Sequence, residues 1–362
     1  MVAAELKALS IEVERVDTAC VRFLGDFYDM AKACLWLRTA ERVLMEVKSF
    51  TALTFDELFE GVKAIDWKNY LARDSFIHVN GKSAKSRLFS VSDCQSITKK
   101  AIVENLRATY RVYTLPETSG EVIIEVGILN NIVTLALDPC GAGLSRRGYR
   151  TYNVDAPISE TLGAAIVMLS RYGAGIPRAD VPRAGIPLID PMCGSGTMPI
   201  EAAMIAQNRA PGLNRGFSAE GWHFLNNEFS LMREQARDSI TNAKLNILGS
   251  DIDARSIDLC KKHAKKAGVI VQWAVKPLKE LVSSESGGII VCNPPYGERM
   301  LKRSDTEKLY RQMREKFGEL DDWSKNIITA YPDFERIYGK RADRRRKLSN
   351  GGMQCTLFMY SS

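Results

Sequence analysis

The spacing of hydrophobic residues in the first half of the chain predicts helices mixed with strands. Apolar residues recur at helical intervals in four segments, residues 1–9, 28–46, 55–65 and 92–106. Strand-like patterns occupy residues 11–16 and 75–80, and a polar, basic loop over residues 81–87 follows the second of them. Because helices and strands do not alternate regularly, we expect an α+β region.

A hairpin is the clearest local element of this half. Residues 121–129 and 132–137 are two apolar, strand-like runs separated only by Asn130 and Asn131. Asparagine tolerates positive φ, which a two-residue hairpin turn requires. We therefore predict two antiparallel strands joined by a tight turn.

The second half shows strands followed by helices. Apolar runs predict strands over residues 186–190, 246–251, 269–275, 289–292, 326–330 and 353–360. Helical spacing predicts helices over residues 156–172, 198–206, 254–267 and 305–317. Repeated strand–helix units predict a mostly parallel, doubly wound sheet with helices on both faces. A length of 362 residues suits two domains, and we divide them at the basic stretch 144–150, as residues 1–150 and 151–362.

Composition narrows the setting of the protein. Hydrophobic residues make up 45% and charged residues 26% of the chain, as in ordinary globular proteins. No apolar run approaches the roughly 20 residues of a membrane span. The eight cysteines form no C-x-x-C pair, so we expect no metal site and no disulfide framework, which fits a reducing cytoplasm. The net charge of +7 permits an anionic partner.

A glycine-containing loop, Asp190-Pro-Met-Cys-Gly-Ser-Gly-Thr197, joins the first predicted strand of the second half to its helix. Gly194 and Gly196 would let the backbone approach a ligand closely. The loop lacks the third glycine of the dinucleotide fingerprint and the G-K-[ST] of a phosphate loop. A carboxylate at Asp190 would repel a pyrophosphate but can pair with an ammonium group. These properties suit S-adenosyl-L-methionine, which has an amino-acid end and no phosphate.

Two further polar motifs follow later strands. Asp251 ends its strand where an acid accepts both ribose hydroxyls in dinucleotide folds. Asn293-Pro-Pro-Tyr296 follows the apolar run 288–292; its two prolines remove backbone donors, and its asparagine adds an acceptor. Acceptors beside an aromatic ring suit a planar base with an exocyclic NH2. They would hold its two hydrogens and leave the nitrogen lone pair facing a methyl donor.

These motifs, in this order on successive strands, resemble the Rossmann-like S-adenosylmethionine-dependent methyltransferases that modify exocyclic amines. The longer match is to the THUMP-domain RNA methyltransferases, and the chain looks most similar to the bacterial 23S ribosomal RNA guanine-N2 methyltransferases. The supporting runs are residues 81–87, 92–96, 147–150, 190–197, 209–215, 249–253 and 293–299. The resemblance implies an α/β Rossmann-like methyltransferase domain, preceded by an α+β ferredoxin-like and THUMP region that binds RNA.

The resemblance also implies roles for individual residues. Catalytic roles fall on the target-amine motif, Asn293, Pro294, Pro295 and Tyr296. Cofactor binding falls on Asp190, Met192, Cys193, Gly194, Gly196, Thr197, Asp251, Ile252 and Asp253. RNA contacts are expected from Lys82, Lys85, Arg87, Arg146, Arg147 and Arg150. The sequence departs from the family at Val275-Lys276-Pro277, where the acid that often follows the third strand is absent.

Several alternatives stay open. Because Asn-Pro-Pro-Tyr serves any exocyclic amine, the protein could be an adenine-N6 methyltransferase or could act on tRNA instead of ribosomal RNA. It could also be a non-enzymatic RNA-binding assembly factor. The basic run from Lys340 to Lys347 suits a solvated face as well as an RNA contact. Trp222 and Phe224 suit core packing at least as well as a pocket wall.

Overall fold

The computed structural model describes residues 1–150, 158–172, 185–296 and 303–362, and the structural statements below concern these ranges. The chain begins with a small α+β unit. Its elements are α1 (Val2–Ala8), β1 (Glu12–Asp17), β2 (Cys20–Leu24) and α2 (Phe27–Trp36). The first helix and strand are confirmed. The predicted helix 28–46 is too long, because the buried Glu5 carboxylate accepts the backbone N–H groups of Arg38 and Thr39 and ends the helical path.

A four-stranded sheet with two helices follows. Its elements are β3 (Met45–Thr51), α3 (Phe55–Lys63), β4 (Phe76–Ala84), α4 (Val91–Tyr110), β5 (Glu121–Leu129) and β6 (Ile132–Leu137). The strand order is β3-β6-β5-β4, with β4 and β5 parallel. The predicted hairpin is confirmed, with φ of 51° at Asn130 and 65° at Asn131. The predicted basic loop is shorter, because β4 stays in register with β5 as far as Ala84.

The second half contains a seven-stranded sheet. Its strands are β7 (Leu188–Asp190), β8 (Ile247–Asp251), β9 (Gln272–Val275), β10 (Gly288–Cys292), β11 (Trp323–Thr329), β12 (Arg344–Asn350) and β13 (Met353–Tyr360). Their order is β12-β13-β11-β10-β7-β8-β9, parallel except for β12 and β13. This confirms the mostly parallel Rossmann-like sheet. The strand β12 was not predicted, because its residues are mostly charged.

Helices cover both faces of this sheet. Helices α5 (Glu160–Leu169), α6 (Thr197–Ala206) and α8 (Ala254–Ala267) share one apolar cluster with one face. Helices α9 (Arg303–Gly318) and α10 (Phe334–Tyr338) share a second cluster with the other face. Short 3-10 helices lie at Trp67–Asn69, Ser218–Gly221 and Leu278–Glu280. The doubly wound arrangement is therefore confirmed.

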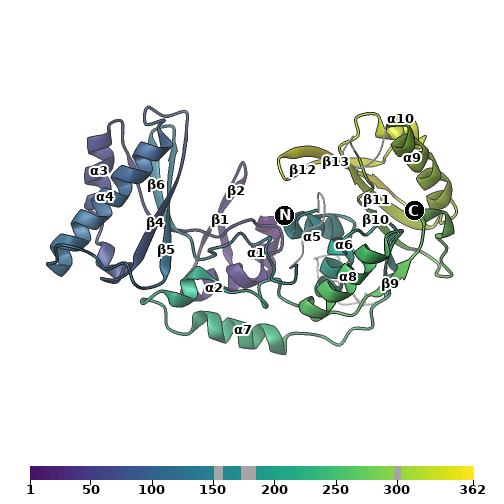
Figure 1. Ribbon diagram of the computed structural model, residues 1–362, viewed down its shortest axis with the longest axis horizontal. Coiled ribbons are helices and arrows are strands. Elements are labelled where there is room, and N and C mark those ends of the chain that lie inside the picture. The colour runs from purple at the N-terminus through teal and green to yellow at the C-terminus, as the bar shows by residue number, and fades with distance from the viewer. Residues whose placement is uncertain (151–157, 173–184, 297–302) are drawn as a thin grey trace.

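A segment of the second half packs into the first. Helix α7 (Glu228–Asp238) lies against α2, and buried residues of 210–236 join the same apolar cluster as residues 6–144. Trp222 stacks on Phe224, with ring centroids 5.3 Å apart, inside this cluster. Both rings are thus core residues and not a wall of the catalytic pocket. Figure 1 shows α7 running beneath the small N-terminal unit.

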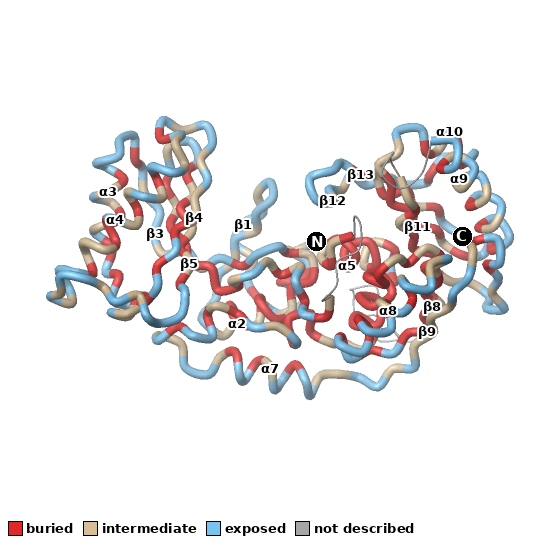
Figure 2. The backbone as a smooth tube through the Cα atoms, in the orientation of Figure 1, coloured by how far each residue is buried: buried red, intermediate tan, exposed pale blue. Residues whose placement is uncertain are grey.

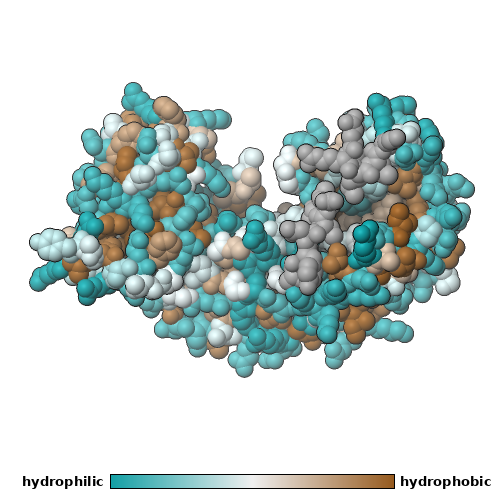
Figure 3. Space-filling model, viewed as in Figure 1, coloured by the Kyte–Doolittle hydropathy of each residue, from teal (hydrophilic) through white to brown (hydrophobic). Residues whose placement is uncertain are grey.

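The molecule has two lobes joined by the N-terminal unit (Figure 1). Buried residues concentrate in the sheets and in α5 and α6, while the outward sides of α3, α4 and α9 are exposed (Figure 2). The space-filling view shows a hollow between the lobes (Figure 3). None of the described helices is long and apolar enough to cross a membrane.

Candidate active site

The sheet order places the three predicted motifs together. Strands β10, β7 and β8 are neighbours and run parallel, so their carboxyl ends meet at one edge. Asp190 ends β7, Asp251 ends β8, and Asn293 follows β10 directly. In open α/β sheets this edge, where the strand order reverses, is where ligands bind.

Asp190 is a buried carboxylate without a full set of partners. Its side chain is 0% exposed; Oδ1 accepts from the Met192 N–H at 3.3 Å, and Oδ2 has no hydrogen-bond partner among the described residues. Burial raises the pKa of the Asp190 carboxyl well above its ordinary value, and the nearby Asp251 raises it further. An incoming ammonium group would supply both the missing hydrogen bond and the missing positive charge. The site therefore fits the amino-acid end of S-adenosylmethionine.

Asp251 holds the glycine loop in place. Its Oδ2 accepts from the Gly194 N–H at 2.9 Å, and its Oδ1 accepts from the Asp253 N–H at 3.0 Å. Each carboxylate oxygen can accept more than one hydrogen bond, so capacity remains for hydroxyl donors such as those of a ribose. Ile252, between the two acids, is 74% exposed and provides an apolar surface beside them.

Helix α8 supports the same loop from behind. The Cys260 thiol donates to the Gly194 carbonyl at 3.1 Å, and His263 Nδ1 donates to the Ser195 carbonyl at 3.1 Å. Cys193 is buried, with its sulfur 3.8 Å from that of Cys260. The sequence motifs did not indicate Cys260 or His263, because neither lies in the loop; their helical spacing alone could have placed them on one face.

The two loop glycines have different tasks. Gly196 has a φ of 81°, and a Cβ there would lie 2.7 Å from the Trp273 ring, so only glycine fits. Gly194 has a φ of 52°, and a Cβ there would meet no heavy atom within 4 Å. The backbone at Gly194 therefore faces open space, as a backbone that contacts a ligand must.

The target-amine motif follows the same edge. Asn293 Oδ1 is buried and has no hydrogen-bond partner among the described residues. Pro294 is buried, while Pro295 and Tyr296 are half-buried. The Tyr296 hydroxyl lies 3.6 Å from Cys355 Sγ in β13, and burial raises the Tyr296 pKa to about 12. An acceptor without a partner thus stands beside a neutral aromatic ring held by the edge hairpin.

A buried polar network corrects two of the expected RNA contacts. The Arg147 side chain is 1% exposed; it donates to the Leu144 and Arg38 carbonyls and pairs with Glu201 at 3.5 Å. Arg150, whose side chain is 14% exposed, donates to Thr197 Oγ1 at 2.5 Å and pairs with Glu160. These guanidinium groups are bound inside the protein, so neither can contact RNA phosphates.

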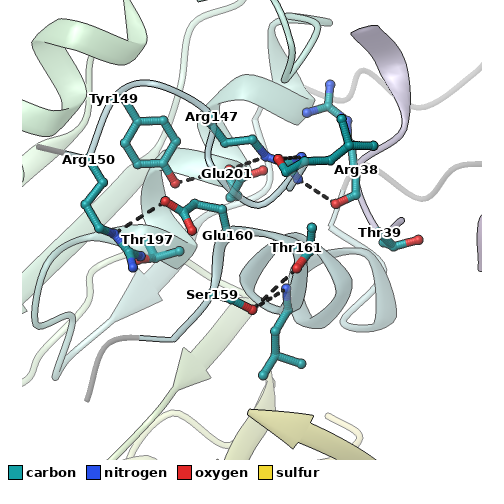
Figure 4. A network of polar contacts seen from close by, with 12 residues as sticks. Arg38, Thr39, Arg147, Tyr149, Arg150, Ser159, Glu160, Thr161, Thr197 and Glu201 are labelled. Carbon is teal, nitrogen blue, oxygen red and sulfur yellow. Dashed lines mark hydrogen bonds and ion pairs between the residues drawn. The ribbon is translucent and has the colours of Figure 1, made fainter. Parts of the chain in front are cut away.

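Figure 4 shows Arg147 and Tyr149 both pointing toward Glu201, which lies in α6 one turn beyond the glycine loop. The Tyr149 hydroxyl donates to Glu201 at 3.1 Å. Because the Thr197 hydroxyl accepts from Arg150, this expected cofactor residue faces the network with its side chain. The network thus fixes the first turn of α6, and the sequence motifs gave no sign of Glu201.

The other expected RNA contacts are exposed. Lys82, Lys85, Arg87 and Arg146 all have high solvent exposure. The first three lie near the end of β4, where Ala84 pairs with Leu129, at the end of the sheet opposite its connection to the N-terminal unit. No group of three or more metal-ligating side chains occurs within residues 1–150, 158–172, 185–296 and 303–362.

Three family models match consecutive parts of the chain. A model described as the RlmL ferredoxin-like domain matches residues 1–44, and one described as the THUMP domain matches residues 52–138. A third, described as an RMKL-like methyltransferase domain, matches residues 147–358. The matches follow the order of the N-terminal unit, the four-stranded sheet and the seven-stranded sheet.

Two relatives extend over the whole chain. YpsC of Bacillus subtilis (strain 168), named as an RNA methyltransferase, is 40% identical and aligns with 100% of this chain and 93% of its own. The ribosomal RNA large subunit methyltransferase K/L of Syntrophotalea carbinolica is 32% identical over 99% of this chain. The match spans 52% of that relative, so this chain corresponds to about half of its length.

Solved structures share the complete architecture. SMU.472, described as a methyltransferase and crystallised with SAH, is 38% identical with a TM-score of 0.91, covering 100% of this chain and 94% of its own. A Listeria monocytogenes protein described as a predicted N6-adenine-specific DNA methylase is 41% identical with a TM-score of 0.90, covering 99% of this chain and 92% of its own. These neighbours share the arrangement of lobes as well as the catalytic sheet.

Proposed function

The chain belongs to the RMKL-like methyltransferase family and is an S-adenosylmethionine-dependent RNA methyltransferase; from this premise we propose that it methylates the exocyclic N2 of a guanine in 23S ribosomal RNA. The observation that carries the choice of an exocyclic amine is the buried, unpartnered Asn293 Oδ1 at the carboxyl edge of β10. A buried acceptor without a partner is costly, and a substrate N–H group would satisfy it.

The proposed mechanism rests on positioning. Bound S-adenosylmethionine supplies an electrophilic methyl group. Asp190 would accept a hydrogen bond from its ammonium end, and Asp251 would accept from its ribose hydroxyls. Asn293 Oδ1 and the Pro294 carbonyl each accept one hydrogen of the base NH2, which directs the nitrogen lone pair at the methyl carbon. Tyr296 stacks on the base. The N–C bond would form as the S–C bond breaks, and the proton that the nitrogen then loses would pass to solvent water. Alignment of this kind can supply most of the rate enhancement, so no dedicated general base is required.

The RNA is recognised in two places in this proposal. The exposed Lys82, Lys85 and Arg87 at the far end of the four-stranded sheet, with Arg146, contact phosphates, which makes binding depend on salt. The target base leaves its stack to reach Asn293, as it must for chemistry on a base edge. The cytoplasm is the proposed compartment, and its reducing conditions suit eight free cysteines, seven of them buried.

The choice of large-subunit ribosomal RNA is supported by the name of the Syntrophotalea relative, and the choice of RNA by the THUMP match, while guanine N2 rests on the resemblance of the sequence motifs. The rival reading, adenine N6, is supported by the description of the Listeria relative and by the tolerance of Asn-Pro-Pro-Tyr for any exocyclic amine. Nothing in the geometry of Asn293 separates the two bases, because both present an NH2 group. The identity of the methylated nucleoside therefore distinguishes guanine N2 from adenine N6.

The decisive experiment is mass spectrometry of nucleosides from ribosomal RNA of a deletion strain and its parent. We expect loss of one N2-methylguanosine, restored by the wild-type gene but not by Asn293→Ala. The variant should still bind S-adenosylmethionine in a calorimetric titration, because Asn293 belongs to the base site. Loss of N6-methyladenosine instead would show that the target base is adenine and not guanine. Unchanged ribosomal RNA would turn the search to tRNA, and near-normal turnover by Asn293→Ala would refute its role.

A further inference from the structure

The strand β12 carries a run of four basic residues along the edge of the catalytic sheet. Arg344, Arg345, Arg346 and Lys347 are all exposed. The strand pairs only with β13, so its outer side is free of backbone partners within the described chain. Side chains of a strand alternate between its two faces, which places these four charges on two different surfaces.

One face carries Arg344 and Arg346. Their cross-strand partners in β13 are Met359 and Leu357, and opposite residues of an antiparallel pair share a face. Both partners belong to the apolar cluster that contains Tyr296. The next residue on this face, Leu348, packs against the same cluster and pairs with Cys355.

This face leads to the target-amine motif. Cys355 Sγ lies 3.6 Å from the Tyr296 hydroxyl, and Asn350, also on this face, hydrogen-bonds Tyr296. Arg346, Leu348 and Asn350 follow one another at two-residue spacing toward that ring. A strand advances about 3.3 Å per residue, so each step along the face is about 7 Å, close to the spacing of phosphates along a nucleic-acid strand.

The other face is occupied differently. Arg345 pairs with Phe358, which belongs to the cluster under α9 and α10. Its guanidinium donates to both carboxylate oxygens of Glu335 in α10, at 3.0 and 2.9 Å. Lys347 shares this face by alternation. The Arg345 guanidinium is thus bound by a carboxylate of the protein itself, which gives one of the four basic residues a structural role.

The side chains of Arg344 and Arg346 have no comparable partner in the described part of the chain. Neither guanidinium makes a hydrogen bond or an ion pair with any residue in the described ranges. Figure 1 shows the β12–β13 hairpin reaching from the catalytic sheet toward the space between the lobes, and Figure 3 shows that the surface is hollowed there. The hairpin turn is the end of β12 nearest the hollow, so from there this face presents Asn350 beside Tyr296, then Leu348, and then the Arg346 and Arg344 guanidinium groups.

We propose that Arg344 and Arg346 form a phosphate-binding track for the RNA strand that flanks the target base. This inference rests on the proposed function and adds a contact in the catalytic domain to those of the THUMP region. Arginine suits the role, because its planar fork binds phosphate oxygens in pairs. Holding the flanking phosphates would keep an unstacked nucleotide near Asn293, so the track acts on RNA binding and not on the cofactor.

Two double variants, each of which removes two positive charges, test the track. Arg344→Gln with Arg346→Gln removes two charges from the Tyr296 face, and Arg345→Gln with Lys347→Gln removes two from the opposite face. RNA binding is measured by fluorescence anisotropy with 23S ribosomal RNA fragments from the deletion strain, at several salt concentrations. Methyl transfer is measured on the same RNA, and S-adenosylmethionine binding by calorimetry. Thermal unfolding of each variant confirms that it is folded.

We expect the Arg344/Arg346 variant to bind RNA at least tenfold more weakly, with a salt slope lower by about one for each arginine removed. Its KM for RNA rises, while its affinity for S-adenosylmethionine is unchanged. The Arg345/Lys347 variant stays within about twofold of wild type in RNA affinity. Equal losses in both variants would mean that only net charge matters, and the track would be refuted, as it would by no loss in either.

The proposed function and the phosphate-binding track can be refuted independently of each other. If wild type binds the RNA but methylates none of it, the target assigned under the proposed function is wrong, and the anisotropy comparison still decides the track. If wild type methylates the RNA and the two double variants behave alike, the function stands and the track is refuted.

Discussion

The burial of Asp190 affects the charge of its carboxyl group, and this charge in turn affects cofactor binding. Its pKa is raised because the carboxylate is fully buried with one unpartnered oxygen. Because the pKa is raised in the folded state, the unfolded chain ionises first, so stability is lost as pH rises from the ordinary pKa of an Asp toward the folded pKa, and the loss stays constant above it. A bound ammonium group favours the ionised form. Cofactor binding should therefore release a proton and strengthen as pH rises.

This linkage gives a pH prediction. S-adenosylmethionine should bind wild type more weakly as pH falls below the raised pKa of Asp190, which calorimetry over a pH series would detect. Asp190→Asn should bind at least tenfold more weakly at neutral pH and lose this dependence, while its apo form should unfold at no lower a temperature than wild type. An unchanged pH dependence in Asp190→Asn would exclude this carboxyl as its source.

Gly196 is a second residue whose role is fixed by local geometry. Gly196→Ala would place a Cβ 2.7 Å from the Trp273 ring at a φ of 81°. Left-handed backbone and overpacking each cost about 1–3 kcal/mol, so urea unfolding should show a combined loss of about 2–6 kcal/mol together with weaker cofactor binding. Gly216→Ala is the control, because its Cβ would meet nothing within 4 Å. Equal stability of the two variants would contradict the steric explanation.

Among the secondary-structure elements, helix α6 is anchored by its buried Glu201. Removing one partner of a buried ion pair costs about 3–5 kcal/mol, because the other charge is left uncompensated. We expect Glu201→Leu to lose stability of this order in urea unfolding, since Arg147 and Tyr149 both bind Glu201.

The matched control for that prediction is an exposed pair. Asp258 pairs with Lys261 in α8 with 68% and 59% of their side-chain areas exposed, and such surface pairs contribute about 0–1 kcal/mol. Asp258→Leu should therefore cost little. Similar losses for the two substitutions would show that Glu201 is no more important than a surface ion pair.

At the scale of the whole molecule, the two halves share a core. Residues 210–236 bury their apolar side chains against α2 and the N-terminal unit. A fragment of residues 147–362 would expose Phe229 and Met232, which are 5% and 2% exposed in the complete chain. We expect this fragment to aggregate in size-exclusion chromatography under conditions where the full chain is monodisperse. A soluble fragment with cooperative unfolding would show instead that the shared core is dispensable.

Local patterns in the sequence predicted the elements that depend mainly on local signals. Residues 254–267 are amphipathic, and Asp253 and Gly268 cap them, so the helix was predicted with the observed bounds. The strand 353–360 was predicted equally well. The strand β12 was missed, because Arg344 to Lys347 carry no alternating pattern and extend only through pairing with β13. The helix 28–46 was overextended, because Glu5 is distant in sequence from Arg38.

The sequence alone determined the order of the glycine loop, the strand-end acid and Asn-Pro-Pro-Tyr, because each motif depends on neighbouring residues and on alternating strands and helices. Only the tertiary structure decided which charges reach solvent. Arg147 looked like an RNA contact beside Arg146, yet Glu201 and two backbone carbonyls bind it inside the protein. Arg344 and Arg345 are adjacent in sequence but face different surfaces, because the register with β13 assigns each its side of the sheet.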